Sequence, residues 1–234
     1  MITLRAAVCG CVVAAALLLT GYTNTVTGTA QRMAGSVPDD LPPLRESQLD
    51  RLLLGVDDLN EIVGSSEMSV VSDVEKLQDS SRVVSDPDCL GSIFASEEDV
   101  YGTGWTAVRD QMIREQGDDD EHWAEQTVVL FPSVNEARGS VNESHSKWVE
   151  CGGFSVAVDD SQGSYLWKID APGSHGDVIT QVVTQEDADG WDCQHTLTNV
   201  SNLVIETMAC AFGVADEAAT MSARIVDRAV KAAK

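Results

Sequence analysis

The sequence predicts an α+β fold, in which an antiparallel sheet of about six or seven strands is flanked by helices. Three features predict it: a long β-hairpin near the C-terminus, several short strand-like runs joined by Gly, Ser, Pro and Asp turns, and helices that follow recognisable capping residues. The chain shows no internal repeat and no sign of a second domain. One core therefore accounts for the body of its 234 residues.

The first 30 residues have the pattern of a secretory signal peptide. They contain one charge, Arg5, followed by an apolar run over residues 6–19 that is short for a transmembrane helix. No second run of this kind follows, so the body is expected to be exported. Residues 31–46 contain three prolines among polar residues and are expected to form a linker, which leaves residues 47–234 as the folded domain.

Strands and short helices are expected to alternate through the first part of the domain. Residues 47–54 suggest a helical turn or an edge segment, and Asp57 is expected to cap a short helix that ends at Gly64. A further helical turn is expected at residues 89–95. Strands are predicted, in chain order, at residues 68–74, 105–114, 123–131, 154–158, 165–169 and 178–185.

Two longer helices have clear start signals. Ser133-Val-Asn-Glu136 is a capping box, and the helix that it opens is expected to run to about Val149. Asp216 can cap the last helix. Its apolar residues recur on one face, which is typical of a helix packed on a sheet: Ala218, Met221, Ile225 and Ala229.

The stretch from Trp191 to Phe212 predicts one β-hairpin. A two-residue turn at Ser201-Asn202 sets Cys193 opposite Cys210, and Asn at the second position tolerates a positive φ. Facing cysteines on antiparallel strands can form a disulfide with little distortion when they occupy a close, non-hydrogen-bonded pair.

Four cysteines follow the signal segment: Cys89, Cys151, Cys193 and Cys210. In an exported chain they most simply form two disulfides, for which three connectivities are possible. The body has no Cys-x-x-Cys pair and its histidines lack the close spacing of a metal site, so no metal and no cofactor is predicted. No Gly-x-Ser-x-Gly motif or triad spacing is present, so no catalytic residue is predicted.

The net charge of −23 restricts the classes of partner that the chain is expected to bind. So acidic a surface argues against nucleic acid and against direct adhesion to anionic lipid. It would suit cationic partners, although solubility alone explains it.

Several motifs occur together in a fixed order. They are Asp88-Cys89-Leu-Gly91, Gly104-Trp105-Thr-Ala-Val-Arg109-Asp-Gln111, Trp123-Ala-Glu-Gln126, Trp148-x-x-Cys151 and Gly190-Trp191-x-Cys193-Gln194. Over residues 47–232 the chain resembles the family of sensor domains related to the extracellular domain of the mycobacterial serine/threonine kinase PknH, which also occur in small lipoproteins. The resemblance implies a curved sheet with a solvent-open cleft. With the hairpin register it favours Cys193–Cys210, which leaves Cys89–Cys151.

The resemblance also raises a question about the signal segment. Lipoproteins of this family end the signal with a lipobox, and Leu18-Leu19-Thr20-Gly21 matches it, but Tyr22 stands where the lipid-bearing cysteine belongs. Tyrosine has no thiol to accept the lipid. Either cleavage near Gly28-Thr29-Ala30 releases the domain, or an uncleaved signal tethers it to the membrane. The expected location is the cell envelope or the extracellular space, with membrane contact only through the N-terminal segment if that segment is retained.

The resemblance implies that the cleft receives an unidentified extracellular ligand, with no catalysis. A polar small molecule such as a sugar or a glycopeptide fragment would suit amide and aromatic side chains. Two other function classes stay open: an envelope module that binds a partner protein, and an envelope hydrolase. The positions expected to line the cleft, each of which could instead be structural, are Trp105, Arg109, Gln111, Glu125, Gln126, Gln185 and Gln194.

Overall fold

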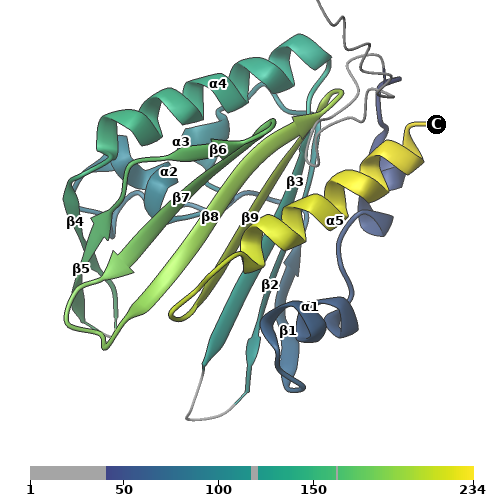
Figure 1. Ribbon diagram of the computed structural model, residues 1–234. Coiled ribbons are helices and arrows are strands. Elements are labelled where there is room, and N and C mark those ends of the chain that lie inside the picture. Colours follow the sequence, from purple (N-terminus) through teal and green to yellow (C-terminus); the bar gives the residue numbers. More distant parts are fainter. Residues whose placement is uncertain (1–40, 117–120, 162) are drawn as a thin grey trace, which may run out of the picture. The chain divides into compact units, whose positions relative to one another are not determined.

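Nine strands form one antiparallel sheet (Figure 1) in the order β1-β2-β3-β9-β8-β7-β5-β4, with β6 paired to β7. This computed structural model describes residues 41–116, 121–161 and 163–234, so the predicted signal segment lies outside the described residues. The strands are β1 (Met68–Val74), β2 (Ala107–Glu115), β3 (His122–Leu130), β4 (Ser155–Asp159), β5 (Ser164–Ile169), β6 (Gly173–His175), β7 (Val178–Gln185), β8 (Trp191–Val200) and β9 (Leu203–Phe212). The α+β class and the antiparallel sheet are confirmed. The sheet has nine strands rather than six or seven. The strand that no predicted segment covers is β6, which has three residues and no apolar pattern.

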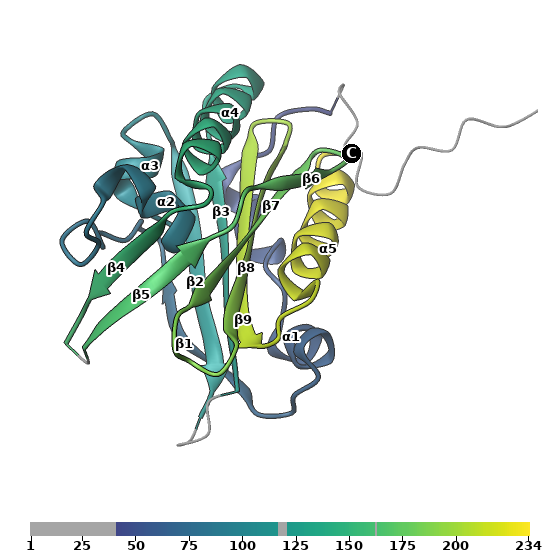
Figure 2. The ribbon, with the colours of Figure 1, turned by 60° about the vertical axis from the view of Figure 1, so that its left-hand side comes forward.

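Helices cover both faces of this sheet (Figure 2). α5 packs across β8 and β9 on one face, and α4, α2 and α3 lie on the other. A 3-10 helix at Glu46–Arg51 precedes them. The α-helices are α1 (Val56–Val63), α2 (Leu90–Ile93), α3 (Glu98–Tyr101), α4 (Val134–Cys151) and α5 (Glu217–Ala232).

The α5 face carries a continuous apolar core. The predicted face of α5 is confirmed, since Ala218, Met221, Ile225 and Ala229 are all fully buried. They pack in the same cluster as Ile205 of β9 and the leucines near the start of the domain. Burying a side chain of this kind stabilises the fold by roughly 1.5–3 kcal/mol.

The folded domain begins before the predicted boundary at residue 47. Leu44, which the linker prediction covered, lies in the core, and its backbone N–H donates to Asn202 Oδ1 at 2.7 Å. Asn202 Nδ2 in turn donates to the carbonyl oxygens of Leu44 and Phe131. The buried amide of Asn202 therefore joins the first residues of the domain to the hairpin turn.

The hairpin register is confirmed: Cys193 pairs with Cys210, and Thr196 with Thr207. The turn differs in one detail. Ser201, not Asn202, has the positive φ of 53°, and the side chain of Asn202 makes the contacts with Leu44 and Phe131. A positive φ at the first turn position alone still matches the twist of a β-hairpin.

Helix caps were predicted at four positions, and two of them are confirmed in full. Ser133 Oγ accepts the backbone N–H of Glu136, and Gly64 ends α1 with a φ of 75°. The N-cap of α1 is Gly55 rather than Asp57, because Asp58 Oδ2 accepts the Gly55 N–H and starts the helix earlier. Asp216 is the N-cap residue of α5, but its side chain makes no capping bond.

Two disulfides hold the α4 side together. Cys89–Cys151 joins the turn before α2 to the end of α4, and Cys193–Cys210 joins β8 to β9. Both expected pairings are confirmed. Trp148 strengthens the junction between α4 and α2, because its side chain is buried and its Nε1–H donates to the Gly91 carbonyl oxygen at 2.8 Å.

Candidate functional site

A cavity of about 860 Å³ opens on the α2 side of the sheet. Its floor is the sheet surface near the ends of β2, β3, β8 and β9, because every second side chain of these strands points to this face. Its sides come from the segment 93–97 and from β4 and β5, which run at a wide angle to β8 and β9 in Figure 2. The solvent-open cleft implied by the resemblance is therefore present.

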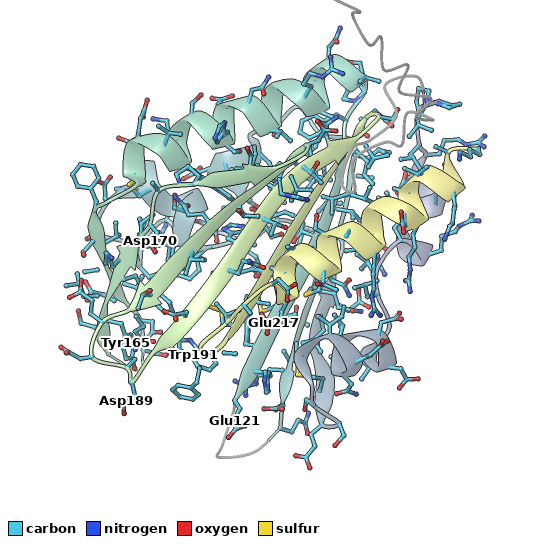
Figure 3. All side chains as sticks on the ribbon, in the orientation of Figure 1. Glu121, Tyr165, Asp170, Asp189, Trp191 and Glu217 are labelled. Carbon is cyan, nitrogen blue, oxygen red and sulfur yellow. A yellow bond between two sulfur atoms is a disulfide. The ribbon has the colours of Figure 1, made fainter. Side chains whose placement is uncertain are left out.

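Aromatic side chains form much of the wall of this cleft. Trp123, Trp167 and Trp191 pack partly buried against the apolar cluster beneath it, and the Trp191 ring lies edge-on to Phe212 with centroids 5.1 Å apart. Figure 3 labels Tyr165 and Trp191 near one end of the sheet, close to Asp189. The aromatic residues in the wall are Phe94, Trp123, Tyr165, Trp167, Trp191 and Phe212.

Buried carboxyl groups lie at the inner end of the cleft and beneath it. Glu97 and Glu125 line the cavity although they are only 1% and 3% exposed. Asp110 and Glu206 are buried beside them on β2 and β9. Carboxyl groups this deeply buried require hydrogen-bond donors or protons to be stable.

The two deeper acids have donors. Glu206 accepts hydrogen bonds from the Tyr101 hydroxyl at 2.8 Å and from the Ser96 N–H at 2.9 Å, and its other oxygen lies 2.8 Å from His195 Nε2. Asp110 accepts hydrogen bonds from the Thr127 hydroxyl and the Gln78 amide. Asp110 and Glu206 are thus structural members of the network under the cleft.

The two acids that line the cavity each have one carboxyl oxygen without a hydrogen-bond partner among the described residues. Glu97 Oε2 accepts the Ser80 N–H at 2.8 Å, and Glu125 shares a hydrogen bond with Asp110. Glu97 Oε1 and Glu125 Oε1 have no hydrogen-bond partner among the described residues. Burial raises the pKa of Glu97, and burial together with the charge of Asp110 raises the pKa of Glu125 well above its ordinary value.

The mouth of the cleft carries ionisable groups of both signs. Arg114 and His122 line it, together with Asp160 and Asp189. His122 Nδ1 lies 3.0 Å from Glu115, which also accepts a hydrogen bond from the Ser65 hydroxyl. In a hydrolase triad the imidazole lies between the serine and the carboxylate, whereas here the carboxylate lies between the serine and the imidazole. This arrangement does not activate Ser65 as a nucleophile.

Two of the seven residues predicted for the cleft line it, Glu125 and Gln185. Three others lie on the opposite face of the sheet, next to the α5 side of the core. On β2, Met112 and Arg114 line the cleft, so alternation turns Gln111 away from it. Gln126 pairs with Gln111 and Gln194 pairs with Ala209, so both share that opposite face. Their predicted place in the cleft is wrong, because the motif alone does not reveal which strand face meets it.

The amides of these three residues have structural partners. Gln126 Oε1 accepts the Leu54 N–H at 2.8 Å, and Gln126 Nε2 donates to the Leu54 carbonyl oxygen at 3.0 Å and to Gln111 Oε1 at 2.8 Å. Gln194 accepts the Ala219 N–H and donates to the Ala215 carbonyl oxygen, which holds the start of α5 on the sheet.

The remaining two predicted residues line a separate cavity of about 450 Å³ beside the 3-10 helix Glu46–Arg51. Arg109 forms ion pairs there with Asp50 and Glu75, both at 2.8 Å, and a longer one with Asp73. Trp105 donates its Nε1–H to the Gly102 carbonyl oxygen. Neither residue lines the large cleft. Arg109, like Gln111, lies on the opposite face of β2.

Sequence reasoning missed several residues that line the cleft. Tyr165 and Trp167 alternate along β5 and could have been found from that spacing, which places both on one strand face. Glu206, which lies beneath the cleft and does not line it, could also have been noticed, because it is the one charged residue within the apolar strand β9. Glu97 lies in an irregular acidic segment, and only the folded structure brings it to Glu125.

Comparisons with known proteins agree with this geometry. The family model of the PknH-like extracellular domain matches residues 44–230. The chain belongs to that family. It is 38% identical over 191 residues to the serine/threonine-protein kinase PknH of Mycobacterium tuberculosis H37Rv and of Mycobacterium bovis, covering 81% of this chain. It spans 30% and 32% of those two kinases, so it corresponds to about a third of their length.

A solved structure extends the comparison to three dimensions. The crystal structure of the extracellular domain of PknH from Mycobacterium tuberculosis matches with a TM-score of 0.77 and 37% identity, covering 81% of this chain and 98% of that one. The chain is therefore homologous to an extracellular sensor domain, and this supports an exported protein. Of the helices in the described residues, none is long and apolar enough to span a membrane.

Proposed function

We propose that this chain is an exported, non-catalytic sensor domain that binds a polar small molecule in the large cleft. The observation that carries the proposal is the cleft itself: about 860 Å³, walled by aromatic rings and provided with two buried carboxyl oxygens that lack partners. Ligand sites are commonly concave and mostly apolar, with a few placed polar groups that fix orientation. Homology to the extracellular domain of a kinase supports a signalling role for the same cleft.

The alternative of a partner-protein module has less support from the surface. Large apolar side chains that are exposed occur on β1, near the end of α4, on β5 and at the end of β9, so they belong to different elements. A partner-binding site would instead be expected to show a contiguous apolar patch. The described surface therefore favours the cleft as the functional feature.

Native mass spectrometry of the protein isolated from its host's envelope or culture fluid tests the proposal. We expect an additional mass that is lost on denaturation. Phe212→Ala should reduce the occupied fraction, because Phe212 lines the cleft and is 57% exposed. Phe154→Ala is the matched control, since Phe154 is 61% exposed and lies outside the cleft lining.

Three results are informative. An adduct that Phe212→Ala weakens and Phe154→Ala leaves intact supports the proposal. An adduct whose occupied fraction neither variant changes would indicate that the ligand binds outside the cleft. A bare protein, with no adduct after incubation with the host's envelope extract, would contradict small-molecule binding.

A further inference from the structure

The two unpaired carboxyl oxygens bear on the chemistry of the ligand, and the inference drawn from them rests on the proposed function. Glu97 Oε1 and Glu125 Oε1 belong to side chains that are more than nine-tenths buried and that line the cavity. A buried acceptor without a donor is unfavourable. Both oxygens are covered in the empty cleft, so a donor on a bound molecule completes these two sites when the carboxyl groups turn toward it.

The surroundings of the two carboxyl groups are acidic. Burial, and then the charges of Glu206 and Asp79, disfavour ionisation of Glu97 in the empty cleft. Burial also disfavours ionisation of Glu125, and the charges of Asp110, Glu206 and Glu97 add to this effect. Tyr101 and His195, which are buried in the network beneath the cleft, are already engaged with Glu206. A positive charge on the ligand would offset this excess of negative charge, while a carboxylate or phosphate would add to it.

The walls define the rest of the ligand. Trp123, Trp167 and Trp191 present aromatic surface around the same cavity. Aromatic faces accept apolar groups and also attract cations. The lining thus combines an acidic inner end with apolar sides.

We propose that the cleft binds a primary amine in its ammonium form, whose N–H groups donate to Glu97 and Glu125 and whose apolar body lies against the tryptophans of the wall. A primary ammonium group supplies three donors, which is enough for two unpaired acceptors whose residues line the same cavity. The contact with carboxylates is charge-assisted and therefore stronger than a bond between neutral groups.

Three probes with one indole body and different head groups test this assignment: tryptamine, the neutral alcohol tryptophol, and the anion indole-3-acetate. Calorimetric titration of the full exported protein should show tryptamine binding about tenfold or more tighter than tryptophol, as expected for a charge-assisted hydrogen bond. Indole-3-acetate should bind more weakly than both. Equal binding of tryptamine and tryptophol, or tighter binding of indole-3-acetate, would overturn the proposal.

Replacing each glutamate by the isosteric glutamine tests whether that residue binds the ammonium group. Glu97→Gln and Glu125→Gln should each weaken tryptamine binding about tenfold and leave tryptophol binding within about twofold. Glu143→Gln is the matched control, because Glu143 is exposed on α4 and outside the cleft lining. Thermal melting of each variant separates loss of binding from loss of fold, and a folded Glu125→Gln protein with unchanged tryptamine affinity would refute the assignment.

The pH dependence gives a second readout on the unmodified protein. Glu125 is faced by Asp110 on β2, Glu206 on β9, and Glu97 and Tyr101 at α3, and Glu206 in turn contacts His195 on β8. Because an ammonium group favours the ionised carboxylate, tryptamine affinity should fall as pH falls through the raised pKa of Glu125, while tryptophol affinity should not follow that trend. An unchanged affinity of tryptamine over that range would contradict the proposal.

The outcomes separate this inference from the proposed function. If the host's protein carries a neutral or anionic ligand in the cleft, the proposed function stands and the ammonium assignment fails. If the host's protein carries none and the three indole probes do not bind, both fail.

Discussion

Glu125 combines two properties that rarely occur together, deep burial and a place in the lining of an open cavity. Its neighbour Asp110 is also buried and also has a raised pKa, from burial in the first place. The pair is stable when one of the two groups holds a proton, which then forms the hydrogen bond between them. At the scale of single residues, the raised pKa values of Glu125 and Asp110 favour a proton on this pair, and the proposed ammonium ligand would displace that proton.

A proton on this pair predicts how stability depends on pH. A carboxyl group whose pKa is raised on folding binds more protons in the folded than in the unfolded state, so its contribution to the free energy of unfolding is present at low pH and is lost as pH rises through the raised pKa. Glu125→Gln removes that group and can donate to Asp110. The variant should gain stability relative to the unmodified protein at pH 8, but not at pH 4.

Urea unfolding at the two pH values measures this difference, with Glu143→Gln as the control. The same pH dependence in Glu125→Gln and in the unmodified protein would show that Glu125 does not hold the proton.

Elements on the α5 face are joined by amide side chains rather than by apolar contact alone. Gln126 binds both backbone groups of Leu54 and so fixes the segment before α1 onto β3. Gln126→Ala leaves these buried groups without partners and should lower the free energy of unfolding by about 2–4 kcal/mol. Gln185→Ala, in the cleft, should change it by less than about 0.5 kcal/mol and act on ligand binding instead.

Urea unfolding of both variants checks this pair. Equal destabilisation, or a stable Gln126→Ala protein that has lost its ligand, would restore Gln126 as a binding residue.

The disulfide between β8 and β9 belongs both to an element and to the site. Cys193 and Cys210 line the cleft, so their bond fixes part of its floor. Replacing both by serine should lower the free energy of unfolding by about 3 kcal/mol for a loop of this size. If urea unfolding gave the variant the same free energy of unfolding as the unmodified protein, the hairpin would hold its register without the disulfide.

Across the whole described domain, the two faces of the sheet have different roles: one forms the main apolar core and the other carries the cleft. The α5 face is a continuous apolar core, and the α2 face combines two smaller apolar clusters with the polar network and the cleft. The sheet supports both because alternate side chains of the same strands serve opposite faces. Arg109 and Arg114, five residues apart on β2, thus reach different cavities.

This division explains which predictions from the sequence hold. The register of the hairpin follows from counting residues across one turn, and the buried face of α5 follows from a 3.6-residue period, so both were predictable locally. The strand face that meets the cleft depends on helices distant in sequence, and for that reason Gln111, Gln126 and Gln194 were misplaced. The meeting of Glu97 with Glu125 likewise depends on how the segment before α3 folds back onto the sheet.

The most direct test of the central claim is ¹⁹F NMR of protein labelled with 5-fluorotryptophan, titrated with its host's envelope extract. The chain has five tryptophans, of which Trp123, Trp167 and Trp191 line the cleft and Trp105 and Trp148 do not. Ligand binding in the cleft predicts shifts of the first three resonances and little change in the other two. Shifts confined to Trp105 and Trp148, or no shift at all, would contradict it.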